Sequence, residues 1–234
     1  MRTLVLLPGM DGSDLLFGPL LESKPPDVRT ITVSYPPGAC NSYEDLLPMA
    51  LGALPTDGPF YVLGWSFSGP MALMVAAKRP PGLRGIVMAS SFVRRPVALP
   101  SWMRHLAQPA LFRLYPASFQ ARALFGGAEA RGLRHLVARA HELAGPAALA
   151  CRARAAMAVD ARELLRSCHV PVLYLRATAD RLIARHHADD AQAILPRLKI
   201  RDIPGPHMAL VTNPARSWAS LASFMEEVDA RGAD

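Results

Sequence analysis

The sequence has few cysteines, very few lysines and no long apolar run. Its three cysteines, Cys40, Cys151 and Cys168, form no CxxC pair. Neither a disulfide framework nor a metal site is therefore expected, and all three are predicted to be buried or half-buried thiols. No apolar run reaches the roughly 18 residues of a membrane-spanning helix. We expect no membrane span, no metal and no other cofactor.

The first apolar run of the chain is short. Residues 2–7 lead directly into Pro8-Gly9, and no small-residue cleavage site follows them. This pattern indicates a buried strand rather than a signal peptide, and the expected location is cytoplasmic.

Lysine is scarce, at 3 of 26 basic residues, and the arginines are unevenly spread. Residues 94–166 contain twelve Arg, no Lys and four acidic residues, a net charge of +8, whereas the rest of the chain has a net charge of −1. Genome composition can account for the preference for Arg, but not for the scarcity of acids in this segment. A localised basic surface attracts anionic partners. Nucleic acid is not expected among them, because no nucleic-acid motif or aromatic interleaving accompanies the charge.

Apolar strand patterns alternate with helical patterns along most of the chain. We expect strands at 2–7, 28–34, 60–65, 83–89, 171–177 and 198–203, and helices near 43–54, 67–78, 185–195 and 214–230. Such alternation predicts the α/β class, a doubly wound parallel sheet with helices on both faces. Residues 94–166 are the exception to this alternation. They contain no strand pattern, and helices are expected there at 129–144 and 146–159. The predicted domains are an α/β core, residues 1–93 and 167–234, and an inserted basic helical lid, residues 94–166.

A strand, a tight turn and a helix meet at Gly64-Trp65-Ser66-Phe67-Ser68-Gly69. Ser66 stands at the apex of the turn. Small residues at positions 64, 68 and 69 allow the strand and the helix to pack closely while Ser66 adopts a strained backbone conformation. The turn raises the Ser66 hydroxyl above the sheet and predicts a nucleophile. An ordinary strand-to-helix turn is the alternative, because the spacing alone is weakly specific.

A serine nucleophile needs a base, and the base needs an orienting carboxylate. His207 follows the last expected strand and Asp180 follows the fifth, so both are expected at the sheet edge that carries Ser66. The alternatives are a solvent-exposed loop histidine for His207, and an N-cap or an ion pair with Arg181 for Asp180. Weaker candidates for the acid, inside an expected helix or strand, are Asp189, Asp190 and Asp202.

The negative oxygen of a tetrahedral intermediate needs two N–H donors. We expect the first from Phe67, the residue after the nucleophile. The second is expected from Met10, in the loop after the first strand, where Gly9 and Gly12 allow a tight fold against the turn at Ser66. A plain strand-to-helix loop is the alternative.

With these residues assigned, the chain resembles the α/β-hydrolase superfamily over nearly its whole length. The order Ser66, Asp180, His207 is that family's order of catalytic residues, and the basic segment falls where the family inserts lids. Three departures are visible: Ser68 where glycine is common, Pro8-Gly9 where many members have His-Gly, and an expected absence of the first two strands of the larger family sheet. The resemblance therefore implies a compact α/β-hydrolase sheet of about six strands.

More narrowly, the chain resembles the bacterial pimeloyl-acyl-carrier-protein methyl ester esterases of biotin synthesis in three features: the turn sequence Gly64-Trp65-Ser66-Phe67-Ser68-Gly69, the small size and the basic lid. That resemblance implies a serine carboxylesterase, with acyl carrier protein as a partner. Acyl-carrier or coenzyme A thioesterase and a non-catalytic ligand receptor are the alternatives. Candidate substrate- or carrier-binding residues are Trp65, Trp102, Phe112, Phe125, Arg94, Arg95, Arg152 and Arg154. Packing between lid and core is the alternative role for the aromatic residues, and a solvated surface for the arginines.

Overall fold

The computed structural model describes residues 1–97, 106–114, 124–125 and 130–231. In these ranges six strands form one sheet: β1 (Arg2–Leu7), β2 (Val28–Thr32), β3 (Phe60–Trp65), β4 (Leu83–Ala89), β5 (Val172–Ala177) and β6 (Lys199–Ile203). Every neighbouring pair is parallel, and the strand order is β2-β1-β3-β4-β5-β6. The predicted α/β fold with a compact six-stranded parallel sheet is confirmed.

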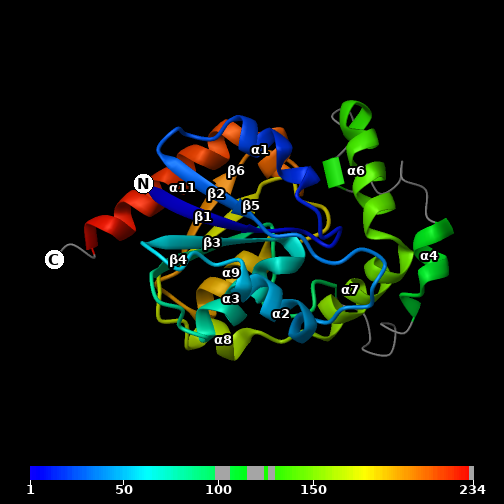
Figure 1. Ribbon diagram of the computed structural model, residues 1–234, viewed down its shortest axis with the longest axis horizontal. Coiled ribbons are helices and arrows are strands. Elements are labelled where there is room, and N and C mark those ends of the chain that lie inside the picture. The colour runs from blue at the N-terminus through cyan, green and yellow to red at the C-terminus, as the bar shows by residue number, and fades with distance from the viewer. Residues whose placement is uncertain (98–105, 115–123, 126–129, 232–234) are drawn as a thin grey trace.

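Helices cover both faces of this sheet (Figure 1). One face carries α2 (Tyr43–Gly52), α3 (Gly69–Ala77), α8 (Arg162–Arg166) and α9 (His186–Ile194). The other carries the 3₁₀ turn η1 (Leu15–Phe17), α1 (Gly18–Glu22), α10 (Ala209–Thr212) and α11 (Pro214–Arg231). Successive strand side chains alternate between the faces. Leu4 and Leu6 therefore join one core and Val5 and Leu7 the other, which is why β1 is apolar throughout.

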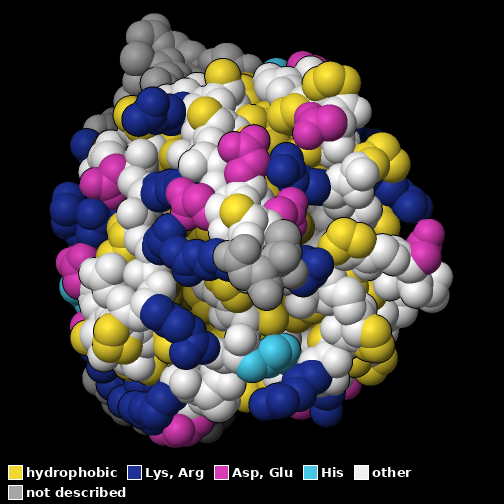
Figure 2. Space-filling model, turned by 90° about the vertical axis from the view of Figure 1, so that its left-hand side faces the viewer, with side chains coloured by type: hydrophobic (Ala, Val, Ile, Leu, Met, Phe, Trp, Pro, Cys, Tyr) yellow, Lys and Arg dark blue, Asp and Glu magenta, His cyan; other side chains and the backbone are white. Residues whose placement is uncertain are grey.

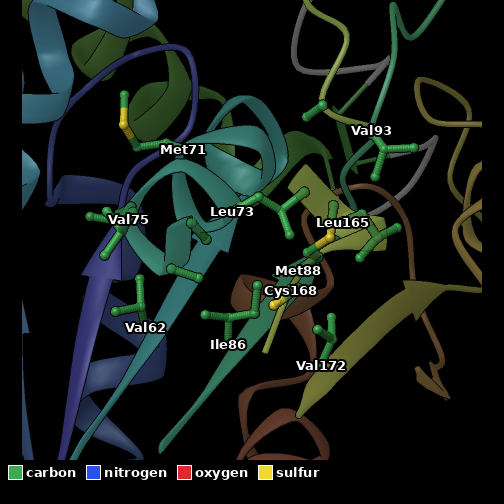
Figure 3. Packing of buried hydrophobic residues seen from close by; sticks show 14 of the residues in the cluster. Val62, Met71, Leu73, Val75, Ile86, Met88, Val93, Leu165, Cys168 and Val172 are labelled. Carbon is green, nitrogen blue, oxygen red and sulfur yellow. The ribbon is translucent and has the colours of Figure 1, made fainter. Parts of the chain in front are cut away.

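The core on the α3 side joins three neighbouring strands to that helix (Figure 3). Burying one such aliphatic side chain stabilises the fold by about 1.5–3 kcal/mol. This core therefore fixes β3 and α3, the two elements that flank Ser66. Its fully or almost fully buried members include Val62, Ile86, Met88 and Val172 of the strands and Met71, Leu73 and Val75 of α3.

The strand order creates a reversal in the middle of the sheet. From β1 the chain crosses to β2 on one side, and it then returns to β3 on the other side and continues in that direction. In open parallel sheets, ligands bind outside the carboxyl ends of the strands at such a reversal. The loop after β1 and the turn after β3 therefore meet where a binding site is expected.

Three helices between β4 and β5 lie beyond the carboxyl ends of the strands: α4 (Pro109–Leu114), α6 (Ala130–Ala144) and α7 (Pro146–Ala158) (Figure 1). A bridge between Arg94 and Asp160 joins the two ends of this inserted segment. Helix α8 also falls within residues 94–166, but its Leu165 packs in the core beside α3. The boundaries of the lid stay a prediction.

At the opposite end of the molecule, Lys and Arg side chains lie among Asp and Glu side chains (Figure 2). Arg2 pairs with Asp229 at 2.8 Å, and Arg201 pairs with Glu227 at 2.5 Å.

Within the described ranges no helix combines the length and apolar character needed to cross a membrane. Nor does a group of three or more His, Cys, Asp or Glu side chains in this part of the chain offer a metal site.

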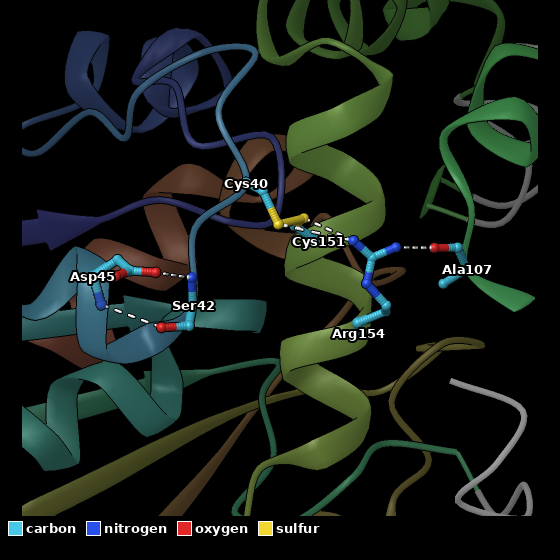
Figure 4. Close-up of a disulfide and its surroundings, with 6 residues drawn as sticks. All are labelled: Cys40, Ser42, Asp45, Ala107, Cys151 and Arg154. Atoms are coloured by element: carbon cyan, nitrogen blue, oxygen red, sulfur yellow. Dashed lines mark hydrogen bonds between the residues drawn. A yellow bond between two sulfur atoms is a disulfide. The ribbon is translucent and has the colours of Figure 1, made fainter. Parts of the chain in front are cut away.

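Cys40 and Cys151 form a disulfide, so the prediction that all three cysteines are thiols is wrong for these two (Figure 4). Cys40 lies in the loop between β2 and α2, and Cys151 lies in α7. The bond therefore ties the core to the inserted segment. No spacing rule relates cysteines that are 111 residues apart, so this pair could not be predicted from the sequence. Cys168 is a buried thiol, as expected.

Removing this disulfide is expected to lower the free energy of unfolding by about 2–4 kcal/mol, because the bond restricts a long loop of the unfolded chain. We expect the double variant Cys40→Ser/Cys151→Ser to melt about 5–15 °C below the wild type. Dithiothreitol should lower the wild-type Tm but not the Tm of the double variant. Thiol titration of the denatured, unreduced wild type should find Cys168 alone among the cysteines; titration of all three would contradict the assignment.

Candidate active site

Ser66 lies in the sharp turn between β3 and α3, at the start of the 3₁₀ turn η2 (Ser66–Ser68). Its φ of +50° is a left-handed conformation that costs a non-glycine residue about 1–3 kcal/mol. A Cβ on Gly64 would lie 2.0 Å from the Ser68 carbonyl oxygen, and a Cβ on Gly69 would lie 1.9 Å from Ser91 Oγ. Glycine is therefore required at both positions, for the steric reason predicted from the sequence.

Neighbouring side chains hold this strained turn in place. Ser91 Oγ donates to the Ser66 carbonyl at 2.5 Å, and the Tyr43 hydroxyl donates to the Phe67 carbonyl at 2.7 Å. The Tyr43 ring also stacks on the Phe67 ring, with centroids 4.5 Å apart. Each such hydrogen bond contributes about 0.5–1.5 kcal/mol, which is comparable to the cost of the strain. The turn is thus held by its own surroundings.

The structure brings Ser66, His207 and Asp180 into one hydrogen-bonded chain. His207 Nε2 lies 2.9 Å from Ser66 Oγ, and His207 Nδ1 lies 2.8 Å from Asp180 Oδ2. The His207 and Asp180 side chains are only 4% and 5% exposed. A carboxylate can only accept a hydrogen bond, so Nδ1 carries the hydrogen and Nε2 is free to accept the Ser66 proton. These are the relations of a nucleophile, a general base and an orienting acid.

The second oxygen of the Asp180 carboxylate has its own partners. Oδ1 accepts hydrogen bonds from the backbone N–H groups of Leu182 and Ile183, both at 2.8 Å. A capping role and an orienting role are therefore compatible, because each uses a different oxygen. The backbone bonds leave Oδ2 directed at His207.

The weaker acid candidates are paired elsewhere. Asp189 and Asp202 both accept from Arg176, at 2.9 Å and 2.6 Å. Asp190 accepts from Arg94 at 2.8 Å. None of the three contacts His207 in the described part of the chain.

The loop after β1 and the start of η2 both line the cavity that contains Ser66. Met10 is the second residue of a turn closed by the Gly12 N–H, which donates to the Gly9 carbonyl at 3.0 Å. The Phe67 N–H precedes the first hydrogen bond of η2, so it has no partner within that turn. Met10 and Phe67 line the same cavity as Ser66 and His207. Their role as oxyanion donors stays a prediction.

This cavity has a volume of about 220 Å³. The acyl part of an ester is the kind of group that such a cavity can hold next to a nucleophile. His141 adds a polar wall group, but burial lowers its pKa to about 4, which keeps the imidazole neutral at neutral pH. The other described walls are mainly apolar and include Leu16, Trp65, Phe92, Val97, Ile183 and Met208.

The four aromatic candidates have different placements. Trp65 is buried and lines the cavity. Phe125 is also buried, but it packs in the core on the η1 side and is not part of the cavity wall. Phe112 is half-buried in α4. Trp102 lies outside the described residues.

The four arginine candidates are likewise dispersed. Arg94 and Arg95 are both exposed, but Arg94 is held in its ion pair with Asp190, whereas Arg95 has no ion pair with a described residue. Arg154 is half-buried and donates to the Ala107 carbonyl at 2.5 Å (Figure 4). Arg152 is 0% exposed. The docking role predicted for Arg152 does not fit this placement, because a buried guanidinium cannot contact a carrier.

Several cavity residues were missed by sequence reasoning. Phe92, Ile183 and Met208 each follow a strand by a few residues, so their position at the carboxyl edge was available as a signal. His141 lies on an amphipathic helix, and its sequence neighbours do not reveal which cavity that helix reaches.

Comparison with known proteins identifies the type of fold and its relatives. A model described as "Alpha/beta hydrolase family" matches residues 4–219. A pimeloyl-[acyl-carrier protein] methyl ester esterase from Neisseria meningitidis is 32% identical over 128 residues, which cover 50% of this chain and 50% of that protein. The chain thus matches about half the length of this curated relative.

Solved structures agree in fold over almost the whole chain. A hydrolase from Oleispira antarctica has a TM-score of 0.81 and 16% identity, covering 97% of this chain and 91% of its own. An esterase from Thermogutta terrifontis has a TM-score of 0.79 and 18% identity, covering 97% and 90%. At such identities the likeness concerns the fold alone.

Proposed function

The chain belongs to the alpha/beta hydrolase family, and from this premise we propose that it is a serine esterase that cleaves carboxylic esters through an acyl-enzyme intermediate. The observation that carries the proposal is the hydrogen-bonded chain of Ser66, His207 and Asp180 at the wall of an apolar cavity. The same fold occurs in esterases, and the Neisseria relative is named as one.

The mechanism follows from the geometry. Ser66 Oγ attacks the acyl carbonyl while His207 Nε2 accepts its proton, and the negative oxygen receives hydrogen bonds from the N–H groups of Met10 and Phe67. His207 then gives the proton to the leaving alkoxide, which departs as an alcohol. A water molecule, deprotonated by His207, attacks the acyl-enzyme and releases the carboxylic acid. Asp180 holds the imidazole in orientation and stabilises its charged form.

For the substrate, we propose an ester whose acyl chain is tethered to an acyl carrier protein. Three observations support it: the apolar cavity, the name of the Neisseria relative, and the charge of the inserted segment. Arg95 is the best-placed described arginine for docking, because it is exposed and adjoins Pro96 and Val97, which line the cavity. Arg113 of α4 is also exposed. An acidic carrier would meet these charges near the cavity mouth.

We expect kcat/KM for the methyl ester of a dicarboxylic acyl chain to be at least about 10-fold higher on acyl carrier protein than free in solution. The preference should shrink between 50 and about 500 mM salt, because the attraction is between exposed charges. Arg95→Glu should reduce the preference by about 3–10-fold. Arg29→Glu, on the exposed edge of the core in β2, is the matched control and should keep it. Equal rates for tethered and free ester would indicate a general esterase.

A thioester of the same acyl chain tests the alternative leaving group, since the triad can act on either. A non-catalytic receptor would bind the ester without turnover.

The cytoplasmic location predicted from the sequence stays a prediction. The Cys40–Cys151 disulfide argues against it, because disulfides persist mainly in oxidising compartments.

A further inference from the structure

Arg152 is a fully buried charge that enters the site from the inserted segment. It lies in α7, and its guanidinium reaches the loops that follow β1 and β2. Nη1 donates to the carbonyls of Met10 and Asp11, at 3.1 Å and 3.0 Å, and Nη2 donates to the carbonyl of Pro36 at 2.8 Å. A buried guanidinium is costly unless its hydrogen bonds are satisfied; here the two Nη atoms are paired, and Nε has no hydrogen-bond partner among the described residues. These three acceptors are all backbone carbonyls, so Arg152 acts on the path of the main chain.

Two further groups offset the buried charge. The Tyr35 ring lies under the guanidinium, with Cζ 5.5 Å from the ring centroid. The carboxyl group of Asp11 is buried nearby and interacts electrostatically with Arg152, while it accepts from the Ser13 N–H and hydroxyl at 3.0 Å and 2.6 Å. The site of the guanidinium is thus built from the oxyanion loop and its neighbours.

The carbonyls that Arg152 holds belong to the turn that directs the Met10 N–H. In a trans peptide, the carbonyl of one residue and the N–H of the next point in opposite directions across a rigid plane. The Gly9 carbonyl is fixed inward by the Gly12 N–H, so the Met10 N–H points outward from the turn. Arg152 fixes the next two planes of the same turn through the Met10 and Asp11 carbonyls. Losing these bonds frees the turn to rotate.

The loop is shaped to receive this side chain. A Cβ on Gly12 would lie 2.3 Å from Arg152 Nη1, and Gly12 has a φ of +76°. The Gly12 carbonyl accepts from the Tyr35 N–H at 2.7 Å. Glycine at this position therefore serves both the turn and the space occupied by the guanidinium.

The same arrangement extends to the second oxyanion donor. The Tyr35 hydroxyl lies 2.7 Å from Ser68 Oγ, and Ser68 Oγ donates to the Pro8 carbonyl at 2.5 Å. Ser68 follows Phe67 in η2. The departure from glycine at position 68 thus supplies a hydroxyl that links the turn at Ser66 to the loop of Met10.

We propose that Arg152 is a positioning residue for the oxyanion hole, a guanidinium from the inserted segment that holds the Met10 N–H in line with Ser66. The inference rests on the proposed esterase function. The disulfide at the preceding residue, Cys151, fastens this part of α7 to the loop that also contains Pro36 (Figure 4). Arg152 contacts neither the oxyanion nor the acyl chain and acts through the Met10 N–H, so its effect is expected on the transition state and not on substrate binding.

The test compares Arg152→Met with Arg152→Lys, using p-nitrophenyl butyrate as the substrate. Arg152→Met is expected to lower kcat by about 10²-fold while KM changes by less than about 3-fold, because a misdirected oxyanion donor weakens the transition state alone. Arg152→Lys keeps the charge with fewer donors and should recover part of kcat. Arg139→Met, in the exposed Arg139–Glu142 pair of α6, is the matched control and should retain wild-type kinetics.

A transition-state analogue separates positioning from general packing. A trifluoromethyl ketone forms a tetrahedral adduct with the serine and carries the oxyanion, whereas the matching methyl ketone probes ground-state binding. The affinity for the trifluoromethyl ketone should fall in Arg152→Met in parallel with kcat/KM, and the affinity for the methyl ketone should not. If Arg152→Met does not fold, Arg152→Lys gives the same comparison with a smaller change.

Unchanged kcat in a folded Arg152→Met, or equal losses of affinity for both ketones, would overturn the proposal. That outcome is distinguishable from failure of the esterase function. If the wild type hydrolyses the ester and Ser66→Ala does not, the proposed function stands whatever Arg152 does. If the wild type hydrolyses no ester, the function itself fails.

Discussion

Replacing Ser66 by alanine is expected to lower kcat for ester hydrolysis by about 10⁵–10⁶-fold, because alanine has no atom that can form the acyl-enzyme. The oxyanion donors and the cavity remain, so residual catalysis above the uncatalysed rate is expected. Hydrolysis of p-nitrophenyl butyrate, followed by absorbance, measures the loss. Alanine at position 66 removes the side-chain hydrogen bond between Ser66 and His207. Because the loss of this bond should cost little stability, the variant should stay folded, with a Tm close to that of the wild type.

The matched control is Ser167→Ala, which removes an exposed hydroxyl at the end of α8 that donates to the Glu163 carbonyl and not to a triad residue. Its kinetics should equal those of the wild type. Loss of a triad residue lowers kcat by several orders of magnitude. A folded Ser66→Ala variant with activity within about 10-fold of the wild type would therefore show that another group is the nucleophile.

Asp180→Asn is expected to lower kcat by about 10⁴-fold with little change in fold. The amide oxygen can still accept from the Leu182 and Ile183 N–H groups, which preserves the local backbone. The amide nitrogen, however, faces His207 Nδ1 and donates to it. The imidazole hydrogen then moves to Nε2, which can no longer accept the Ser66 proton.

Asp189→Asn is the control for this prediction, since Asp189 also follows β5 but pairs with Arg176. The two variants should differ in kcat by about three orders of magnitude or more. Both kcat values come from the same ester assay, with circular dichroism as the check on folding. Similar losses in the two variants would remove Asp180 from the proposed triad.

The sequence was informative wherever the determinants are local. The six strands begin and end within one or two residues of their predicted positions, because each is an apolar run bounded by turn residues. Parallel strands share one carboxyl edge, so the positions of Ser66, Asp180 and His207 just after three strands were enough to predict that they meet. Their hydrogen-bond distances bear out that proximity.

Features that depend on distant parts of the chain could not be predicted. Cys40 and Cys151 are 111 residues apart, and only the docking of α7 on the β2–α2 loop brings them together. Arg152 lies in an Arg-rich segment, where charge counting favours a solvated or docking role. Which of these arginines turns inward is decided by the packing of α7, and composition does not contain that information.

Backbone strain at Ser66 was predicted from the sequence, but the residues that stabilise the strained turn were not. Ser66 was expected to be strained, and it has a positive φ. The residues that hold it, Ser91 and Tyr43, come from other elements and carry no motif. The same is true of Tyr35, which connects Ser68 to the loop of Met10 through its ring and hydroxyl.

Covalent labelling with a fluorophosphonate identifies the nucleophile, because such reagents react with a serine that a neighbouring base has activated. The labelled wild-type protein would be digested and the modified residue located by tandem mass spectrometry. We expect a phosphonate on Ser66, and no labelling at that residue in His207→Gln. A phosphonate on a different serine, or an unlabelled Ser66 in a protein that hydrolyses esters, would contradict it.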